Sequence, residues 1–127
     1  MPEKDGRREE ESPMELWDYR PDVYDRGKSL DLVGYHVQAT DGKIGSIDEA
    51  TYQVGESYVI VDTGPWIFGK KVLLPAQVIT SIDPQERNVF VSRTKAEIKD
   101  APEFDEGTFK EPEYRSRIGD YYGRFPG

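Results

Sequence analysis

The sequence predicts a small, mainly β domain that folds as a barrel of about six strands. Nearly all Val and Ile residues lie in the middle of the 127-residue chain, in short runs separated by turn residues. Short strands at this close spacing are typical of a sheet that closes on itself, because closure removes unpaired edges. We therefore expect a barrel domain at 29–106, a flexible acidic leader at 1–28, and a polar, partly disordered Tyr/Gly-rich tail at 107–127.

The first two predicted strands flank a hairpin turn. Apolar residues alternate along Val33–Ala39 from its first position onward, which places them on one face of a strand. Asp41 and Gly42 follow, and this pair favours a tight hairpin because both residues tolerate positive φ. The next run, 43–50, loses strict alternation around Gly45, where we expect a bulge that bends the strand.

Four further runs complete the predicted sheet. They are Ser57–Thr63, Lys71–Leu74, Gln77–Asp83 and Asn88–Ser92. The first of them is apolar on both faces, as expected of a buried central strand. Pro75 ends the second, because proline has no N–H to donate to a ladder.

One short helix is expected after the last strand. Thr94 and Glu97 have the spacing of a capping box, in which each side chain accepts a hydrogen bond from the other residue's backbone N–H. The helix should run from Lys95 to about Lys99. Ala101 and Pro102 then end it, because the residue before a proline disfavours helical backbone.

The composition narrows the possible classes of function. The net charge is −8 and the isoelectric point is about 4.7, so we expect no direct binding to a nucleic-acid backbone. The absence of cysteine excludes disulfides and thiolate chemistry. No apolar run approaches the length of about 18 residues that suggests a membrane helix, and the first residues lack a secretory apolar core. We therefore expect no membrane insertion and a cytoplasmic location.

The sequence offers little for catalysis or metal binding. His36 is the only histidine, and strand alternation places it on the exposed face, with no activating motif for a catalytic triad. Transition-metal sites usually recruit several His or Cys ligands. Asp48 and Glu49 are adjacent and so point to opposite faces of a strand. We expect no enzyme activity, no bound metal and no cofactor.

A segment that begins at Gly64 has the G-x-x-x-x-G-K spacing of a phosphate-binding loop. However, Lys71 stands where such a loop needs Ser or Thr to hold magnesium. The residues that follow predict a strand, whereas a phosphate-binding loop opens a helix. We therefore interpret this segment as a connection between strands.

The same connection carries the candidate interaction patch. Trp66 and Phe68 are two positions apart and point the same way in an extended chain. Two interpretations remain open: these rings cap the end of the barrel, or they form a contact surface, where aromatic residues are enriched. The adjacent Lys70 and Lys71 suit recognition of a carboxylate. The candidate patch is therefore Trp66, Phe68, Lys70 and Lys71.

The terminal segments are polar, with scattered aromatic residues. Two interpretations of residues 1–28 remain open: a flexible leader, or a segment that docks through Trp17 on the domain or on another copy. Tyr121 and Tyr122 occupy a similar position in the tail. We take Trp17, Tyr121 and Tyr122 as candidate tail anchors.

Three motifs resemble the PRC-barrel domain. They are VG-x-x-V before D-G-x-I-G, then W-x-F-G-K-K-V-x-L-P, and finally T-K-x-x-I-K-x-A-P-E-F, which together span most of residues 29–106. This domain is shared by the cytoplasmic part of the photosynthetic reaction-centre H subunit and the C-terminal half of the ribosome maturation factor RimM. The ending GDYYGRFPG resembles that of stand-alone bacterial PRC-barrel proteins, several of which are labelled stress-related.

The resemblance implies a six-stranded barrel without enzyme activity, because known members act as protein-binding adaptors or assembly modules. The predicted function is a cytoplasmic protein-interaction or assembly module, stress-related and self-associating. We expect a protein partner and a homo-oligomer, since a small domain gains buried area by association. Two alternatives stay open: a ribosome- or RNA-associated assembly factor, and a small-ligand sensor at the barrel mouth.

Overall fold

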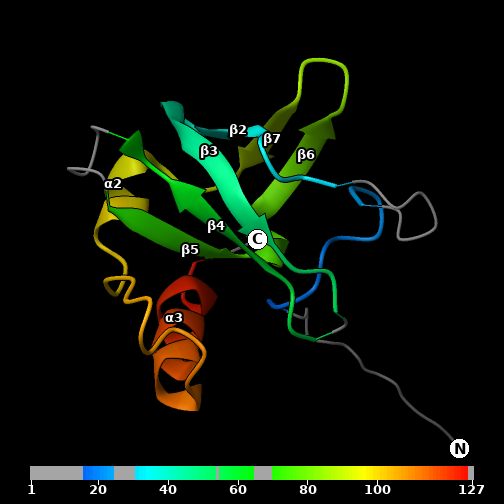
Figure 1. The fold of residues 1–127 in the computed structure, drawn as a ribbon. Coiled ribbons are helices and arrows are strands. Elements are labelled where there is room, and N and C mark those ends of the chain that lie inside the picture. The colour runs from blue at the N-terminus through cyan, green and yellow to red at the C-terminus, as the bar shows by residue number, and fades with distance from the viewer. Residues whose placement is uncertain (1–15, 25–30, 54, 65–69, 126–127) are drawn as a thin grey trace, which may run out of the picture.

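The computed structural model describes residues 16–24, 31–53, 55–64 and 70–125, and every structural statement below refers to these residues. The strands are β2 (His36–Ala39), β3 (Gly42–Ala50), β4 (Tyr58–Asp62), β5 (Lys71–Pro75), β6 (Ile79–Asp83) and β7 (Asn88–Val91). The helices are the 3₁₀ turn η3 (Ala76–Val78), α2 (Lys95–Lys99) and α3 (Pro112–Gly123). Figure 1 shows the strands wrapped around one interior, with α2 beside the start of β5.

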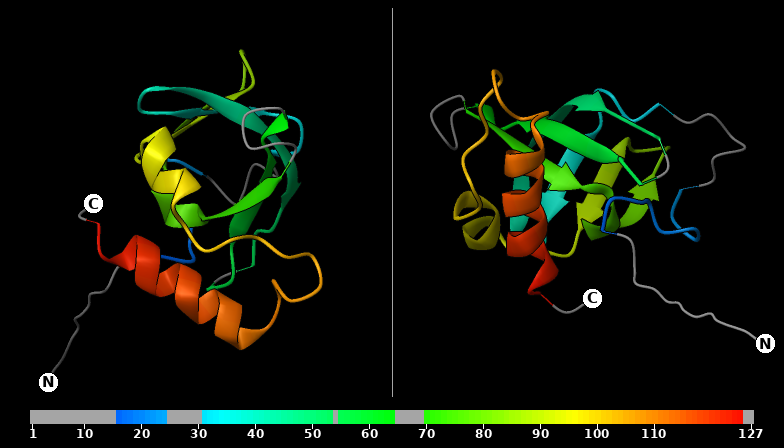
Figure 2. Two further views of the ribbon diagram at one scale, coloured as in Figure 1. Left: turned by 90° about the vertical axis from the view of Figure 1, so that its left-hand side faces the viewer. Right: turned by 90° about the horizontal axis from the view of Figure 1, so that it is seen from below.

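The six strands form one mixed sheet in the order β5-β4-β3-β2-β7-β6. Neighbouring strands are antiparallel except β2 and β7, which are parallel. The sheet curls into a ring (Figure 2), which confirms a mainly β, barrel-like fold of six strands. The expected closure is wrong, because β5 and β6 are outer strands that do not pair with each other in the described part of the chain. The chain turns directly from one into the other through η3, so these edges diverge.

The bulge expected at Gly45 is present. Val37 of β2 faces Gly45 of β3, while the next residue, Gln38, faces Lys43, so that Ile44 is the extra residue. A second shift of register lies between Ile47 and Glu49, opposite β4. Bulges increase the local twist of a strand, which helps this nine-residue strand to curve.

The start of the first strand differs from the prediction. Val33 was expected to lie in this strand on its buried face, but the strand begins at His36 and Val33 is 44% exposed. The cause is a turn at Gly34, whose φ of +91° departs from extended backbone. From Tyr35 onward the alternation holds, since Tyr35 and Val37 are buried and His36 is exposed.

Helix α2 begins with the predicted capping box. The Glu97 N–H donates to the Thr94 hydroxyl oxygen at 3.1 Å, and the Thr94 N–H donates to the Glu97 carboxylate at 2.9 Å. Ile98, the buried residue of this short helix, is 1% exposed and packs into the core. The helix thus covers apolar interior close to the start of β5.

Helix α3 is an element that the predicted polar tail did not include. Its buried residues, Tyr114, Ile118 and Tyr122, are spaced by four positions and form one face of the helix. Figure 2 shows this helix lying against the outside of the barrel. Neither α2 nor α3 combines the length and the apolar character that a membrane crossing requires, and the described residues contain no other α-helix.

Part of the predicted leader also belongs to the packed structure. Tyr19 and Tyr24 are each 6% exposed and lie within the hydrophobic core. The Ser57 N–H donates to the Trp17 carbonyl at 2.8 Å, and the Gln77 N–H donates to the Leu16 carbonyl at 3.1 Å. Residues 16–24 are therefore packed against the domain.

We expect the buried tyrosines to make folding sensitive to alkaline pH. Burial raises the pKa of Tyr52 and of Tyr114 to about 12, and raises the pKa of Tyr122 as well. Because these folded-state pKa values exceed the unfolded value of about 10, their contribution to stability is complete below about pH 10. It falls as pH rises through the folded pKa values, by about 1.4 kcal/mol per pH unit for each tyrosine.

Urea unfolding at about pH 9 and about pH 11 tests this expectation. The free energy of unfolding should be clearly lower at the higher pH, and a Tyr114→Phe variant should lose less between the two. Equal stability of the unmodified protein at both pH values would contradict the prediction.

Candidate functional site

Two cavities lie side by side at the start of β5 and share four residues. The larger, the polar hollow, has a volume of about 620 Å³, and the smaller, the apolar cavity, about 310 Å³. The shared residues are Lys70, Lys71, Glu103 and Phe104. The polar hollow is completed by Asp105, Glu106, Thr108 and Arg117, and the apolar cavity by Val72, Leu73, Ile98, Lys99, Ala101 and Pro102.

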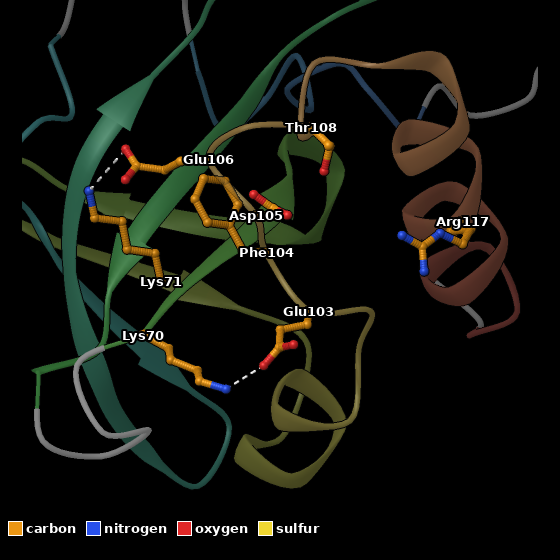
Figure 3. Close-up of a pocket in the computed structure, with 8 residues that line it drawn as sticks. All are labelled: Lys70, Lys71, Glu103, Phe104, Asp105, Glu106, Thr108 and Arg117. Atoms are coloured by element: carbon orange, nitrogen blue, oxygen red, sulfur yellow. Dashed lines mark hydrogen bonds and ion pairs between the residues drawn. The ribbon is translucent and has the colours of Figure 1, made fainter.

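Ion pairs join the two sides of the polar hollow. Figure 3 shows the two lysines spreading apart, with Lys70 paired to Glu103 and Lys71 reaching Glu106 at 3.9 Å. Lys71 also pairs with Asp48 of β3 at 2.9 Å, and this hydrogen bond raises the pKa of its ammonium group. Exposed ion pairs of this kind contribute little to stability, so they exchange readily with other contacts.

The loop that forms the other wall is held by its own contacts. The Asp105 carboxylate accepts a hydrogen bond from the Gly107 N–H at 2.8 Å, and the Asp105 carbonyl accepts from Thr108 and Phe109. The Phe104 ring packs on the Phe109 ring with centroids 5.0 Å apart. These contacts hold the wall in one conformation.

The predicted interaction patch is placed only in part. Lys70 and Lys71 line both cavities, whereas Trp66 and Phe68 lie outside the described residues. The sequence analysis missed Glu103 and Phe104, which lie more than 30 positions further along the chain. Only the short helix followed by Pro102, which returns the chain toward β5, hinted at this proximity.

Trp17, one of the predicted anchors, lies at a different place from the two cavities. Its ring meets that of Tyr58 edge-on, with centroids 6.4 Å apart. The Arg115 guanidinium of α3 lies 4.4 Å from the centre of the Trp17 ring. This cation–π contact links the N-terminal segment to α3.

The two tyrosine anchors differ in their hydrogen bonding. The Tyr121 hydroxyl donates to the Glu97 carbonyl of α2 at 2.5 Å. The neighbouring Tyr122 is 3% exposed, and its hydroxyl has no hydrogen-bond partner among the described residues. Both side chains therefore contact the folded domain, but only one satisfies its polar group there.

We expect opposite effects when each hydroxyl is removed. Tyr121→Phe should lower the free energy of unfolding by about 1 kcal/mol, because it leaves the Glu97 carbonyl without its donor. Tyr122→Phe should raise it by about 1 kcal/mol, because an unsatisfied buried hydroxyl costs stability. Urea unfolding of both variants measures the difference, and a loss of stability in Tyr122→Phe would contradict the second expectation.

The other residues that could serve in catalysis or metal binding lie at separate places in the fold. His36 is exposed and lines a separate open hollow with Lys43 and Asp62. Asp48 and Glu49 are both exposed, and the Asp48 carboxylate forms an ion pair with Lys71. Within the ranges that the structure covers, no three His, Asp or Glu side chains gather as a metal site would require.

The fold and the two cavities define a small, mainly β protein with an open six-stranded sheet and a hollowed surface at one outer strand. No family model and no curated protein matches the chain. Among solved structures, it is similar to a 16S ribosomal RNA processing protein, RimM, from Pseudomonas aeruginosa, with 22% identity and a TM-score of 0.42. That match covers 57% of this chain and 44% of the other, so it spans less than half of that protein's length.

Proposed function

We propose that this chain is a non-enzymatic protein-interaction module that binds its partner at the surface formed by Lys70, Lys71, Glu103 and Phe104. The observation that supports the proposal is the meeting of two cavities at these residues. One side is charged and the other apolar, a combination that suits an interface with an apolar centre and a polar rim.

The energetics of the surface agree with this role. Lys70 and Glu103 have side chains that are 55% and 70% exposed, so their pair is easily exchanged for contacts with a partner. Phe104 is held between the charged residues by its contact with Phe109, which gives the surface a fixed aromatic centre. Fixed aromatic residues surrounded by a polar rim commonly dominate binding energy.

The alternatives are weighed by the same observations. Association with ribosomes or RNA stays a prediction from the resemblance, and the net charge of −8 disfavours direct contact with phosphates. A ligand-sensing role is favoured by the apolar cavity, whose 310 Å³ lies at the lower end of small-molecule sites. Stress response, self-association and a cytoplasmic location remain expectations of the sequence.

Affinity capture from native cell extract tests the proposed surface. The wild-type chain, a Lys70→Glu/Lys71→Glu variant and a Lys43→Glu control are compared; Lys43 is exposed and lines a different hollow. We expect a specific protein on the wild type and the control that is lost from the double variant. The partner is then purified and its Kd is measured for all three. Equal Kd values would show that this surface is not the binding site.

A further inference from the structure

The free edge of β5 can be located from its hydrogen bonds. The Thr63 N–H donates to the Lys70 carbonyl at 3.3 Å, and the Ala76 N–H donates to the Ser57 carbonyl at 3.1 Å. Hydrogen-bonded pairs alternate with non-bonded pairs in an antiparallel ladder. With the observed register, Val72 and Leu74 are therefore bonded to β4. It follows that the N–H and C=O groups of Lys71 and Leu73 point away from the sheet.

The apolar cavity lies along this edge. Leu73 lines the cavity, and because β5 is an outer strand, its N–H and C=O groups point to the side away from β4. The opposite wall comes from Ile98 and from the loop that contains Pro102. Outside the ladder with β4, the Leu73 backbone forms no hydrogen bond with any other described residue. Buried backbone groups are nearly always paired, so a donor and an acceptor are available here for a ligand.

The rim of the apolar cavity is basic. Three lysines and one glutamate line it, in a chain whose net charge is −8. Lys70 and Lys71 are paired with Glu103 and Asp48, respectively. Lys99 is exposed, and it has no ion pair within the part of the chain that the structure describes. This ammonium group is therefore free to receive an anion.

The free edge and the apolar cavity together favour an extended ligand. The free N–H and C=O groups of an outer strand pair with another extended backbone. The apolar cavity, about 310 Å³ in volume, lies along this edge. It has room for an apolar side chain carried by an extended backbone that passes along β5.

We propose that the partner contributes a short extended segment that pairs with the free edge of β5 at Leu73. One apolar side chain of this segment fills the apolar cavity, and a carboxylate close to it in sequence binds Lys99. Strand addition of this kind gains affinity from backbone hydrogen bonds and specificity from side-chain cavities. The inference rests on the proposed protein-interaction function, for which it specifies the chemistry of the partner.

A capped hexapeptide, acetyl-Thr-Val-Phe-Val-Asp-Thr-amide, is the probe, because Asp two positions after Phe lies on the same side of an extended chain. Its affinity is measured by calorimetry, and amide NMR follows hydrogen exchange at Leu73, which should slow on binding. A version with Asn for Asp, and a version N-methylated at Phe and at the Val that follows it, should each bind about tenfold more weakly or worse. The same N-methylated peptide keeps every side chain, so its equal binding would overturn strand addition. 4-Phenylbutyrate offers a ring and a carboxylate without a backbone, and its equal affinity would also overturn the proposal in favour of a small organic acid.

Protein variants locate the site independently. Lys99→Glu should weaken peptide binding about tenfold and Lys99→Gln less, whereas Lys43→Glu should leave it unchanged. Ala101→Phe, which fills the cavity from a half-exposed position, should abolish binding. Unchanged peptide affinity in both Lys99→Glu and Ala101→Phe would overturn the assignment of the cavity.

Failure of this inference can be told apart from failure of the proposed function. If partner capture depends on Lys70 and Lys71 but no peptide binds wild type, the interaction surface stands and strand addition is wrong. The opposite result is also informative. If the peptide slows hydrogen exchange at Leu73, but the captured partner has the same Kd for the wild type and for the Lys70→Glu/Lys71→Glu variant, the proposed surface is wrong and the edge site stands.

Discussion

Gly45→Ala should lower the free energy of unfolding by about 3 kcal/mol or more and the melting temperature by roughly 10 °C. A Cβ atom at this position would lie 2.0 Å from the carbonyl oxygen of Asp62 and 2.9 Å from the Cα of Thr63. Both contacts are with backbone, which cannot rotate away as a side chain would. Its φ of +156° adds conformational strain for any residue other than glycine. Urea unfolding followed by circular dichroism measures the loss.

Gly123→Ala is the matched control, because a Cβ added there has no atom within 4 Å. It lies at the end of α3, where alanine favours helix more than glycine does. We expect this control to equal the wild type or to be slightly more stable. A Gly45→Ala protein within 1 kcal/mol of wild type would show that β3 and β4 are further apart than the structure places them.

Ile118→Ala should lower the free energy of unfolding by about 3 kcal/mol. Ile118 is 1% exposed and lies at the centre of the buried face of α3, between Tyr114 and Tyr122. Its truncation removes apolar contact and leaves a cavity between the helix and the barrel. A loss of this size would show that the tail contributes to the stability of the whole domain.

Two further substitutions calibrate the result. Ile118→Val should cost only about 0.5–1.5 kcal/mol, because most of the side chain remains. Ser116→Ala, at an exposed position of the same helix, should change stability by less than about 0.5 kcal/mol. Similar effects from Ile118→Ala and Ser116→Ala would mean that α3 does not pack on the barrel in solution.

The barrel could be predicted because local patterns in its sequence coincide with its contacts. The capping box of Thr94 and Glu97 and the bulge at Gly45 each depend on residues that are close in sequence or on a local break in alternation. Val33 was misplaced because alternation does not reveal where a turn such as that at Gly34 interrupts it. Closure was overpredicted, since η3 was interpreted as part of the following strand.

Helix α3 was missed for a different reason. Its apolar face consists of two tyrosines and one isoleucine among charged residues, so composition suggested a polar tail. The spacing by four positions was a usable signal, as was Pro112 in the first turn, where proline is favoured. The contact of Trp17 with Arg115 could not be predicted, because Arg115 is almost 100 positions away and no local pattern connects the two residues.

The candidate site could be predicted only on one side. Lys70 and Lys71 stand out in the sequence because they follow an aromatic segment. The other wall, including Glu103 and Phe104, depends on how α2 and the following loop fold back along β5. Which β5 backbone groups remain free depends on register, and register follows from pairing rather than from composition.

The contact between Trp17 and Arg115 has a consequence for the order of synthesis. Trp17 is synthesised before the strands of the barrel, but the guanidinium that covers it belongs to a helix that is synthesised after them. Translation of the intervening stretch takes roughly 5–20 s at about 5–20 residues per second. During this interval the Trp17 ring lacks its final cover, so the N-terminal segment completes its folding only after α3 has been synthesised.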